Sequence, residues 1–274
     1  MPDQTPAETA AMEIKLEMVT PKYALELLEL NTRNRTVSER QVDAYARDMA
    51  NGRWEMNGQT ICIGTDFTLL DGQHRLLAVV RSGATIPMHI AWGVDPAAQA
   101  TMDTGRARTA ANALQLEGAE NATILAAVAK LGVISDSGGL TELNRRVSHS
   151  EIRAWIAENP AAHDSCHFAA RYKKGSAVSG AILAYSHFRF GQIDAVEADR
   201  FWIDSVEMVG LKAGDPVIAM NKFFLDARRR RARTPQNIAL SVVFRAWNYR
   251  RSGQSARFIR AVTNGEVVKI PDLR

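Results

Sequence analysis

Cysteine and long apolar runs are both scarce in this chain. Two of its 274 residues are cysteine, too few for a disulfide framework or a typical zinc site. No apolar run approaches the roughly 20 residues that a membrane helix requires. The N-terminal residues are polar and acidic, unlike a signal peptide. These absences lead us to expect a cytoplasmic protein with no membrane partner.

Several common signatures of catalysis are also missing. The chain has no Walker loop, no Gly-x-Ser-x-Gly elbow and no dinucleotide-binding fingerprint. It has no dense carboxylate cluster of the kind that two-metal nucleases use. His163 and His167 flank Cys166 and would share a helix face, but no second cluster with zinc-ligand spacing accompanies them. We interpret these three as surface or core residues.

The composition predicts a globular protein with an uneven charge distribution. Hydrophobic residues make up 46% of the chain, enough for one large or two modest domains. Residues 1–110 hold 11 Lys and Arg against 14 Asp and Glu, residues 111–220 hold 10 against 13, and residues 221–274 hold 13 against 3. The net charge of +4 therefore comes from the C-terminal segment.

The most informative stretch is residues 68–83, where an apolar strand end breaks at Gly72 and passes into a helix that ends at Gly83. A helix N-terminus favours phosphate because its first N–H groups and its dipole carry partial positive charge. Arg75 would add a bidentate grip, and His74 a second donor. The structural alternative is that Asp71 caps the helix while His74 packs against the sheet.

The pentapeptide Asp71-Gly72-Gln73-His74-Arg75 resembles the phosphate-binding motif of the ParB/sulfiredoxin superfamily, especially the DGQHR proteins of DNA-modification and phage systems. The segment 31–35 and the helix after it resemble the arginine-bearing loop of that superfamily, and residues 86–92 resemble its next strand. The resemblance covers roughly residues 14–110.

This resemblance implies a small mixed α/β domain that binds a nucleoside triphosphate, ATP or CTP, with Mg²⁺. The phosphates would contact Gly72, Gln73, His74, Arg75, Arg33, Arg35 and Arg106. Asp71, His74 and Arg75 are the candidate catalytic residues, and Asp71 and Glu39 are the candidate Mg²⁺ ligands. Arg106 also fits a simple turn and helix cap.

Two departures from the superfamily pattern limit what carries over. Gln73 stands where sulfiredoxin has its reactive cysteine, so reduction of a sulfinic acid is excluded. The segment from Gln73 to Arg75 also lacks the paired arginines of partition proteins, so their CTP preference does not carry over. The identity of the nucleotide stays open.

A run of arginines marks the C-terminal segment: Arg228, Arg229, Arg230, Arg231 and Arg233. Their mutual repulsion is relieved by water, salt or a polyanion, and DNA or RNA phosphates would serve. The alternative is a solvated turn between two helices. Thr234 and Pro235 then start an apolar helix. Trp247, Tyr249 and Phe258 lie among the later arginines and could stack on bases, but they are better explained as core residues.

The rest of the chain shows helical patterns. Helices are expected over 110–116, 124–134, 177–190 and 195–209, and from His149 to Asn159. We therefore predict an α+β protein with a flexible N-terminus (1–13), a ParB/sulfiredoxin-like nucleotide-binding domain (14–110) and an all-helical domain with a basic end (111–274).

The first functional hypothesis is an NTP-hydrolysing ParB-like protein that acts on DNA, plausibly from a phage or mobile element. The second is a non-enzymatic DNA-binding regulator or partition-type clamp that nucleotide switches. The third is a kinase for a small hydroxyl or a hydroxylated base. A homodimer is compatible with each of them.

Overall fold

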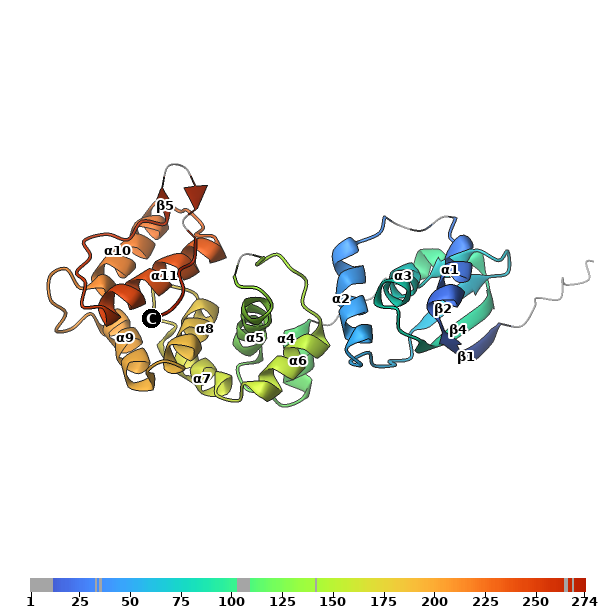
Figure 1. Ribbon diagram of the computed structural model, residues 1–274, viewed down its shortest axis with the longest axis horizontal. Helices are drawn as coiled ribbons and strands as arrows, with labels where there is room; N and C mark the ends of the chain where they lie inside the picture. The colour runs from blue at the N-terminus through green and yellow to red at the C-terminus, as the bar shows by residue number, and fades with distance from the viewer. Residues whose placement is uncertain are drawn as a thin grey trace, which may run out of the picture. The chain divides into compact units, whose positions relative to one another are not determined.

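The computed structural model describes residues 12–32, 34, 36–102, 109–140, 142–263, 266–267 and 269–274 (Figure 1). It divides into two compact units, residues 1–107 and residues 108–274, close to the domain boundary that the sequence suggests. Most of the N-terminal segment 1–13, together with Arg33, Arg35 and Arg106, lies outside the described residues. No helix in the described ranges is long and apolar enough to cross a membrane.

Unit 1, residues 1–107, is a small α+β layer. Its elements are β1 (Glu13–Val19), α1 (Pro21–Glu29), α2 (Glu39–Ala50), β2 (Thr60–Gly64), β3 (Leu69–Asp71), α3 (Gln73–Ser82), β4 (Ile86–Val94) and the 3-10 helix η1 (Pro96–Thr101). The strand order is β1-β4-β2-β3; β2 and β4 are parallel, and the other two pairs are antiparallel. The sheet is therefore mixed.

Helices α1, α2 and α3 bury their apolar faces in one core with the sheet. Leu76, Val79 and Val80 share the face of α3 that packs into this core, with Leu76 and Val79 fully buried and Val80 partly buried. Gly83 ends the helix in the left-handed conformation, with φ of 70°. β4 covers the expected strand at 86–92 and extends it by two residues. Helix α1 was not expected from the sequence.

Unit 2, residues 108–274, is mainly helical. Its helices are α4 (Ala110–Leu116), α5 (Ala122–Asp136), α6 (His149–Glu158), α7 (Ala162–Tyr172), α8 (Gly180–Gly191), α9 (Ala195–Glu207), α10 (Pro216–Arg229) and α11 (Gln236–Arg251). The prediction of an all-helical domain is wrong in one respect, because β5 (Val262–Thr263) and β6 (Glu266–Val267) form a short antiparallel ladder after α11.

Aromatic rings dominate the core of unit 2. Trp247 on α11 stacks on Phe190 of α8, with ring centroids 4.1 Å apart, and meets Phe201 of α9 edge to face. Trp247 is fully buried, which confirms that it is a core residue, and Tyr249 packs partly buried against the same core. Phe258 is 63% exposed, so its interpretation as a core residue is wrong. The contacts fix α8, α9 and α11 against one another.

Candidate functional site

The turn between β3 and α3 requires a glycine. Gly72 has φ of 109°, a conformation that side-chain-bearing residues rarely adopt. A Cβ on Gly72 would lie 2.4 Å from Cδ1 of Ile61 on the adjacent strand β2. The Asp71-Gly72 sequence thus lets α3 start directly over the sheet, with its N-terminus at the end of β3.

Asp71 braces this turn but does not cap the helix. Its Oδ1 accepts a hydrogen bond from the N–H of Gly72 at 2.7 Å, and its Oδ2 accepts one from Nη2 of Arg75 at 2.8 Å. Gly72 is itself the N-cap residue of α3, and no side chain caps that end. The structural alternative of an Asp71 cap is therefore wrong.

Arg75 lies almost entirely inside unit 1, with its side chain 9% exposed. Its Nη2 also donates to the carbonyl oxygen of Thr60 on β2 at 2.9 Å. The neighbouring carboxylate of Asp71 is 31% exposed. A buried guanidinium is therefore balanced by one carboxylate that reaches the surface.

Gln73 and His74 connect the start of α3 to the segment before α2. Nε2 of His74 accepts a hydrogen bond from the backbone N–H of Ser38 at 2.9 Å, which leaves Nδ1 to carry the proton of the neutral ring. The Oε1 of Gln73 accepts from Nδ2 of Asn31 at 3.2 Å. Both motif side chains are buried.

A third segment reaches the same place from η1. Nε2 of Gln99 donates to the carbonyl oxygen of Leu70 at 2.9 Å. Nδ2 of Asn34 donates to the carbonyl oxygen of Leu69 at 2.6 Å, and Asn34 also contacts Gln99. The amides of Asn34 and Gln99 therefore satisfy the carbonyls at the end of β3. Sequence reasoning missed Gln99, for which no motif gives a signal.

Residues from three parts of the chain thus meet at the N-terminus of α3: Asn31 and Ser38, the motif 71–75, and Gln99 of η1. The structure does not place the candidate phosphate ligands Arg33, Arg35 and Arg106. All three arginines lie outside the described residues.

Glu39, the second candidate Mg²⁺ ligand, does not bind the same residues as Asp71. Glu39 at the start of α2 pairs with Arg81 on α3 through a contact of 2.7 Å, and Arg81 also binds Asp43. Asp71 pairs with Arg75 instead. In the described part of the chain, no three His, Cys, Asp or Glu side chains are grouped to hold a metal ion.

The arginine segment lies on the surface of unit 2, between α10 and α11. Arg228, Arg229, Arg230, Arg231 and Arg233 are all exposed. Arg228 donates to the carbonyl oxygen of Ser176 at 3.0 Å, and Arg229 lies 3.7 Å from Asp226. The other three have no ion-pair partner among the described residues.

The contact of Arg228 with Ser176 brings a second basic segment beside the first. Ser176 belongs to the turn between α7 and α8, which also carries the exposed residues Lys173 and Lys174. These lysines precede the arginine run by about 50 residues, so the distribution of charge along the sequence did not show that the two basic segments lie side by side. We call the exposed cations of the two segments the basic surface: Lys173, Lys174, Arg229, Arg230, Arg231 and Arg233.

Several of the later arginines instead have structural roles. Arg250 pairs with Glu197 and Asp204 on α9, each at 2.6 Å, and Arg251 pairs with Asp194 at 2.9 Å. Arg250 thereby joins α11 to α9. The positive charge that the sequence shows beyond the arginine run is therefore partly neutralised within unit 2.

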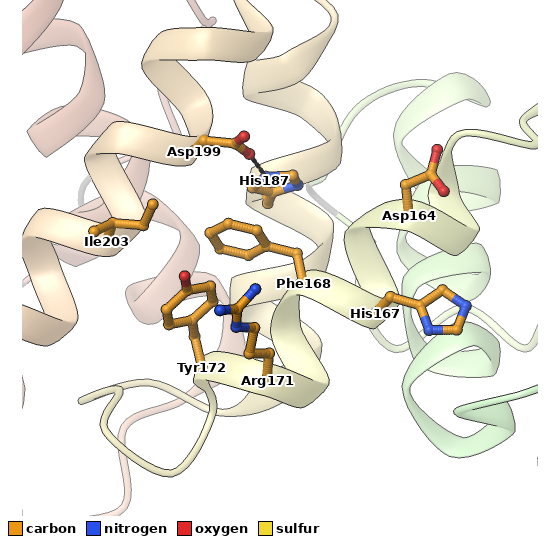
Figure 2. Close-up of a pocket in the computed structure, with 8 residues that line it drawn as sticks. All are labelled: Asp164, His167, Phe168, Arg171, Tyr172, His187, Asp199 and Ile203. Atoms are coloured by element: carbon orange, nitrogen blue, oxygen red, sulfur yellow. Dashed lines mark hydrogen bonds and ion pairs between the residues drawn. The ribbon is translucent and has the colours of Figure 1, made fainter.

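Figure 2 shows a hollow on unit 2, lined by Asp164, His167, Phe168, Arg171, Tyr172, His187, Asp199 and Ile203. His187 lies 2.7 Å from Oδ1 of Asp199 through Nε2, and 2.9 Å from Oγ of Ser165 through Nδ1. The order Ser-His-Asp is that of hydrolytic triads. Ser165 on α7 is only 4% exposed, however, and of the three side chains it is the carboxylate of Asp199 that is exposed. The trio therefore joins α7, α8 and α9 without offering an accessible nucleophile.

The surroundings of His163, Cys166 and His167 differ from one another. Cys166 is buried, as expected of a core residue, and burial raises the pKa of its thiol to about 12. His167 contacts Glu120 at 3.6 Å. His163 is partly exposed.

In comparisons with known proteins, no family model, no curated protein and no solved structure matches the chain. Function is therefore inferred from the chemistry of the residues and from the resemblance of the motif.

Proposed function

We propose that unit 1 binds the phosphates of a nucleoside triphosphate at the N-terminus of α3 and hydrolyses it, and that unit 2 binds DNA. The observation that carries the proposal is the buried Arg75 at a glycine-initiated helix N-terminus, where two further polar segments meet. A buried guanidinium is costly unless it has an anionic partner. In unit 1 that partner is Asp71.

Phosphate binding at this site is an exchange of anions. An incoming phosphate would compete with the partly exposed Asp71 carboxylate for Arg75, while the helix dipole adds to the attraction. Asp71, once released from the guanidinium, would be free to hold Mg²⁺ or to accept a proton from the attacking water. Catalysis would then consist mainly of positioning and charge neutralisation.

The basic surface supports the assignment of DNA as the partner. Arg230, Arg231 and Arg233 extend from the end of α10 without carboxylate partners among the described residues, and two lysines lie on the adjacent turn. A phosphate backbone neutralises such a surface and releases counterions from the DNA. Such contacts carry no base information, so they predict binding that depends weakly on sequence.

The proposal is tested by titrating the protein calorimetrically with ATP, CTP, GTP and UTP in the presence of Mg²⁺, with and without duplex DNA, and by measuring released phosphate. We expect saturable binding of at least one nucleotide and more than one phosphate released per chain. No binding of any nucleotide under any of these conditions would reject the phosphate site.

A non-enzymatic DNA-binding regulator is the second candidate. The observation that favours it is that both oxygens of Asp71 already accept hydrogen bonds, so a catalytic role requires rearrangement. In that case nucleotide would bind without multiple turnover while DNA affinity changed with nucleotide. Steady phosphate release that DNA stimulates would exclude this alternative.

A further inference from the structure

Strand β1 forms an edge of the sheet in unit 1 (Figure 1). It pairs with β4 on one side, and no strand in the described ranges pairs with its outer side. An open edge of seven residues is a template for another strand, since its outward N–H and C=O groups are available for pairing.

One face of β1 is apolar and exposed. Ile14, Leu16 and Met18 alternate along the strand, and their side chains are 52%, 58% and 59% exposed. The opposite face turns toward the helices, because the β4 partner of Val19 is Ile86 and both belong to the core with α1, α2 and α3. An apolar stripe at an open edge indicates a partner.

The charges on the helix-side face make β1 complementary to itself. That face carries Glu13, Lys15 and Glu17, with the basic residue between two acidic ones. Within the chain Lys15 pairs with Glu13 at 2.8 Å, and Glu17 accepts a hydrogen bond from the hydroxyl of Tyr23 at 2.7 Å, so contacts across the axis would add to these. The midpoint of the strand is Leu16, on the apolar face. An antiparallel pair centred there would set Lys15 opposite Glu17 of the partner subunit and Ile14 opposite Met18 of the partner subunit.

We propose that β1 pairs antiparallel with β1 of a second copy of this chain, with Leu16 opposite Leu16 of the partner subunit. A pair centred on residue 15 would set Lys15 opposite Lys15 of the partner subunit. A pair centred on residue 17 would set Glu17 opposite Glu17 of the partner subunit. Like charges in direct opposition destabilise a sheet. The centred register also uses all seven residues of the strand.

Such a dimer has closed two-fold symmetry, because the same strand edge is used by both copies. The two four-stranded sheets become one continuous sheet, and the exposed apolar stripes join across the axis. The pairing depends on unit 1 alone and is independent of whether that unit binds nucleotide.

Two cysteine variants of matched exposure test the register. Leu16→Cys would place the new thiol opposite itself, where Cβ atoms lie about 4.5–5.5 Å apart and oxidation can join them. Met18→Cys is equally exposed but would lie opposite Ile14 of the partner subunit. Both native cysteines are buried, so they do not compete. We expect the Leu16→Cys chain to cross-link at least about tenfold faster than the Met18→Cys chain, because disulfide formation falls steeply with distance.

Sedimentation of the full-length protein provides the second readout. The wild type should be a dimer, and Lys15→Glu should make it monomeric by placing a carboxylate opposite Glu17 of the partner subunit. Lys22→Glu, a charge reversal on the exposed surface of α1, should leave the dimer intact. A monomeric wild type, or equal cross-linking of the two cysteine variants, would overturn the proposal.

Discussion

At the scale of single residues, Gly72 determines whether the motif can exist in its present form. Its backbone adopts φ of 109°, and the space where a Cβ would lie is filled by Ile61. The glycine therefore meets two demands at once, a conformational one and a steric one. Gly83 at the other end of α3 meets only the first, since nothing lies within 4 Å of its would-be Cβ.

This pair of glycines gives a matched comparison. Gly83→Ala should cost about 1–2 kcal/mol of unfolding free energy from the left-handed backbone alone. Gly72→Ala should cost more, by about 1–3 kcal/mol of overpacking against Ile61. Adding Ile61→Val, which removes Cδ1, should recover part of that excess. Denaturant unfolding of the wild type, the two glycine variants and the double variant measures these free energies. Equal losses of unfolding free energy for Gly72→Ala and Gly83→Ala would contradict the predicted clash with Ile61.

The sequence predicted the glycine turn and the helix after it, but not how the motif side chains are used. His74 meets Ser38 across 36 residues, and Arg75 meets Thr60 across 15. Local spacing carries no information about such long-range partners. The contacts of Asp71 are local, with Gly72 and with Arg75 four residues later, but the sequence did not show that its oxygens would bind these groups instead of the helix N–H groups that a cap binds.

At the scale of secondary-structure elements, Gly132 lets α5 and α6 pack closely in unit 2. A Cβ on Gly132 of α5 would lie 2.1 Å from Cε2 of Trp155 on α6. The indole Nε1 of Trp155 is in turn held by Asp136 at 2.8 Å. This hydrogen bond and an edge-to-face contact with Phe188 restrain the ring beside Gly132.

We predict that Gly132→Ala lowers the free energy of unfolding by about 1–3 kcal/mol, because a methyl group is forced against a fixed ring. Gly191→Ala at the end of α8 is the control, since that position is open and helical. It should be neutral or stabilising by up to about 1 kcal/mol. Thermal or denaturant unfolding of the two variants distinguishes them, and a stable Gly132→Ala protein would contradict the packing described.

The junction of α7, α8 and α9 predicts a pH dependence. Burial lowers the pKa of His187, against the opposing effect of Asp199. A histidine whose pKa is lower in the folded state is protonated first in the unfolded chain, whose histidine pKa is about 6.5. The stability that neutral His187 contributes is therefore fully present above about pH 6.5 and is lost as the pH falls below that value.

Melting temperatures at pH 7.5 and pH 5.5 measure this effect. The wild type should lose stability on acidification, and His187→Gln should lose less because the titrating group is gone. Part of the acid sensitivity should remain in the variant, since burial and two nearby arginines also lower the pKa of His149. An identical acid shift in wild type and variant would exclude His187 as a source.

Most helices of unit 2 were predictable because their ends carry local signals. Ser148 and Glu151 form the capping box that begins α6, and the expected helices at 124–134, 177–190 and 195–209 correspond to α5, α8 and α9. Helix α10 was not predicted. The strands β5 and β6 have only two residues each, too few to show an alternating pattern.

At the scale of the whole molecule, excess positive charge is concentrated where the fold leaves it unpaired. Unit 2 neutralises Arg250 and Arg251 internally but leaves Arg230, Arg231 and Arg233 exposed. Arg228 is different, since it is bonded to Ser176. The sequence alone does not distinguish these arginines. The fold shows which of them form ion pairs within unit 2 and which are exposed and able to bind a partner.

Replacing Arg230, Arg231 and Arg233 with Gln should weaken binding to duplex DNA and make its salt dependence shallower by about 2–3 in log–log slope, since each phosphate contact contributes about 0.9. Retaining Arg228 preserves its contact with Ser176. The control is Arg200→Gln, an exposed arginine beside Asp204. Fluorescence anisotropy at several salt concentrations measures the slope, and an unchanged slope would remove the basic surface from the DNA interface.

The phosphate site is the central claim, and its most direct measurement compares two arginines of α3 in the nucleotide titration. Arg75→Ala should weaken Mg²⁺–triphosphate binding by about 2 kcal/mol or more, because a charge-assisted contact is lost. Arg81→Ala, on the same helix as Arg75, loses exposed ion pairs with Glu39 and Asp43 of α2 and should bind like the wild type. Because Arg75 also braces the turn, circular dichroism must show a folded protein. A folded Arg75→Ala variant with wild-type affinity would contradict the account.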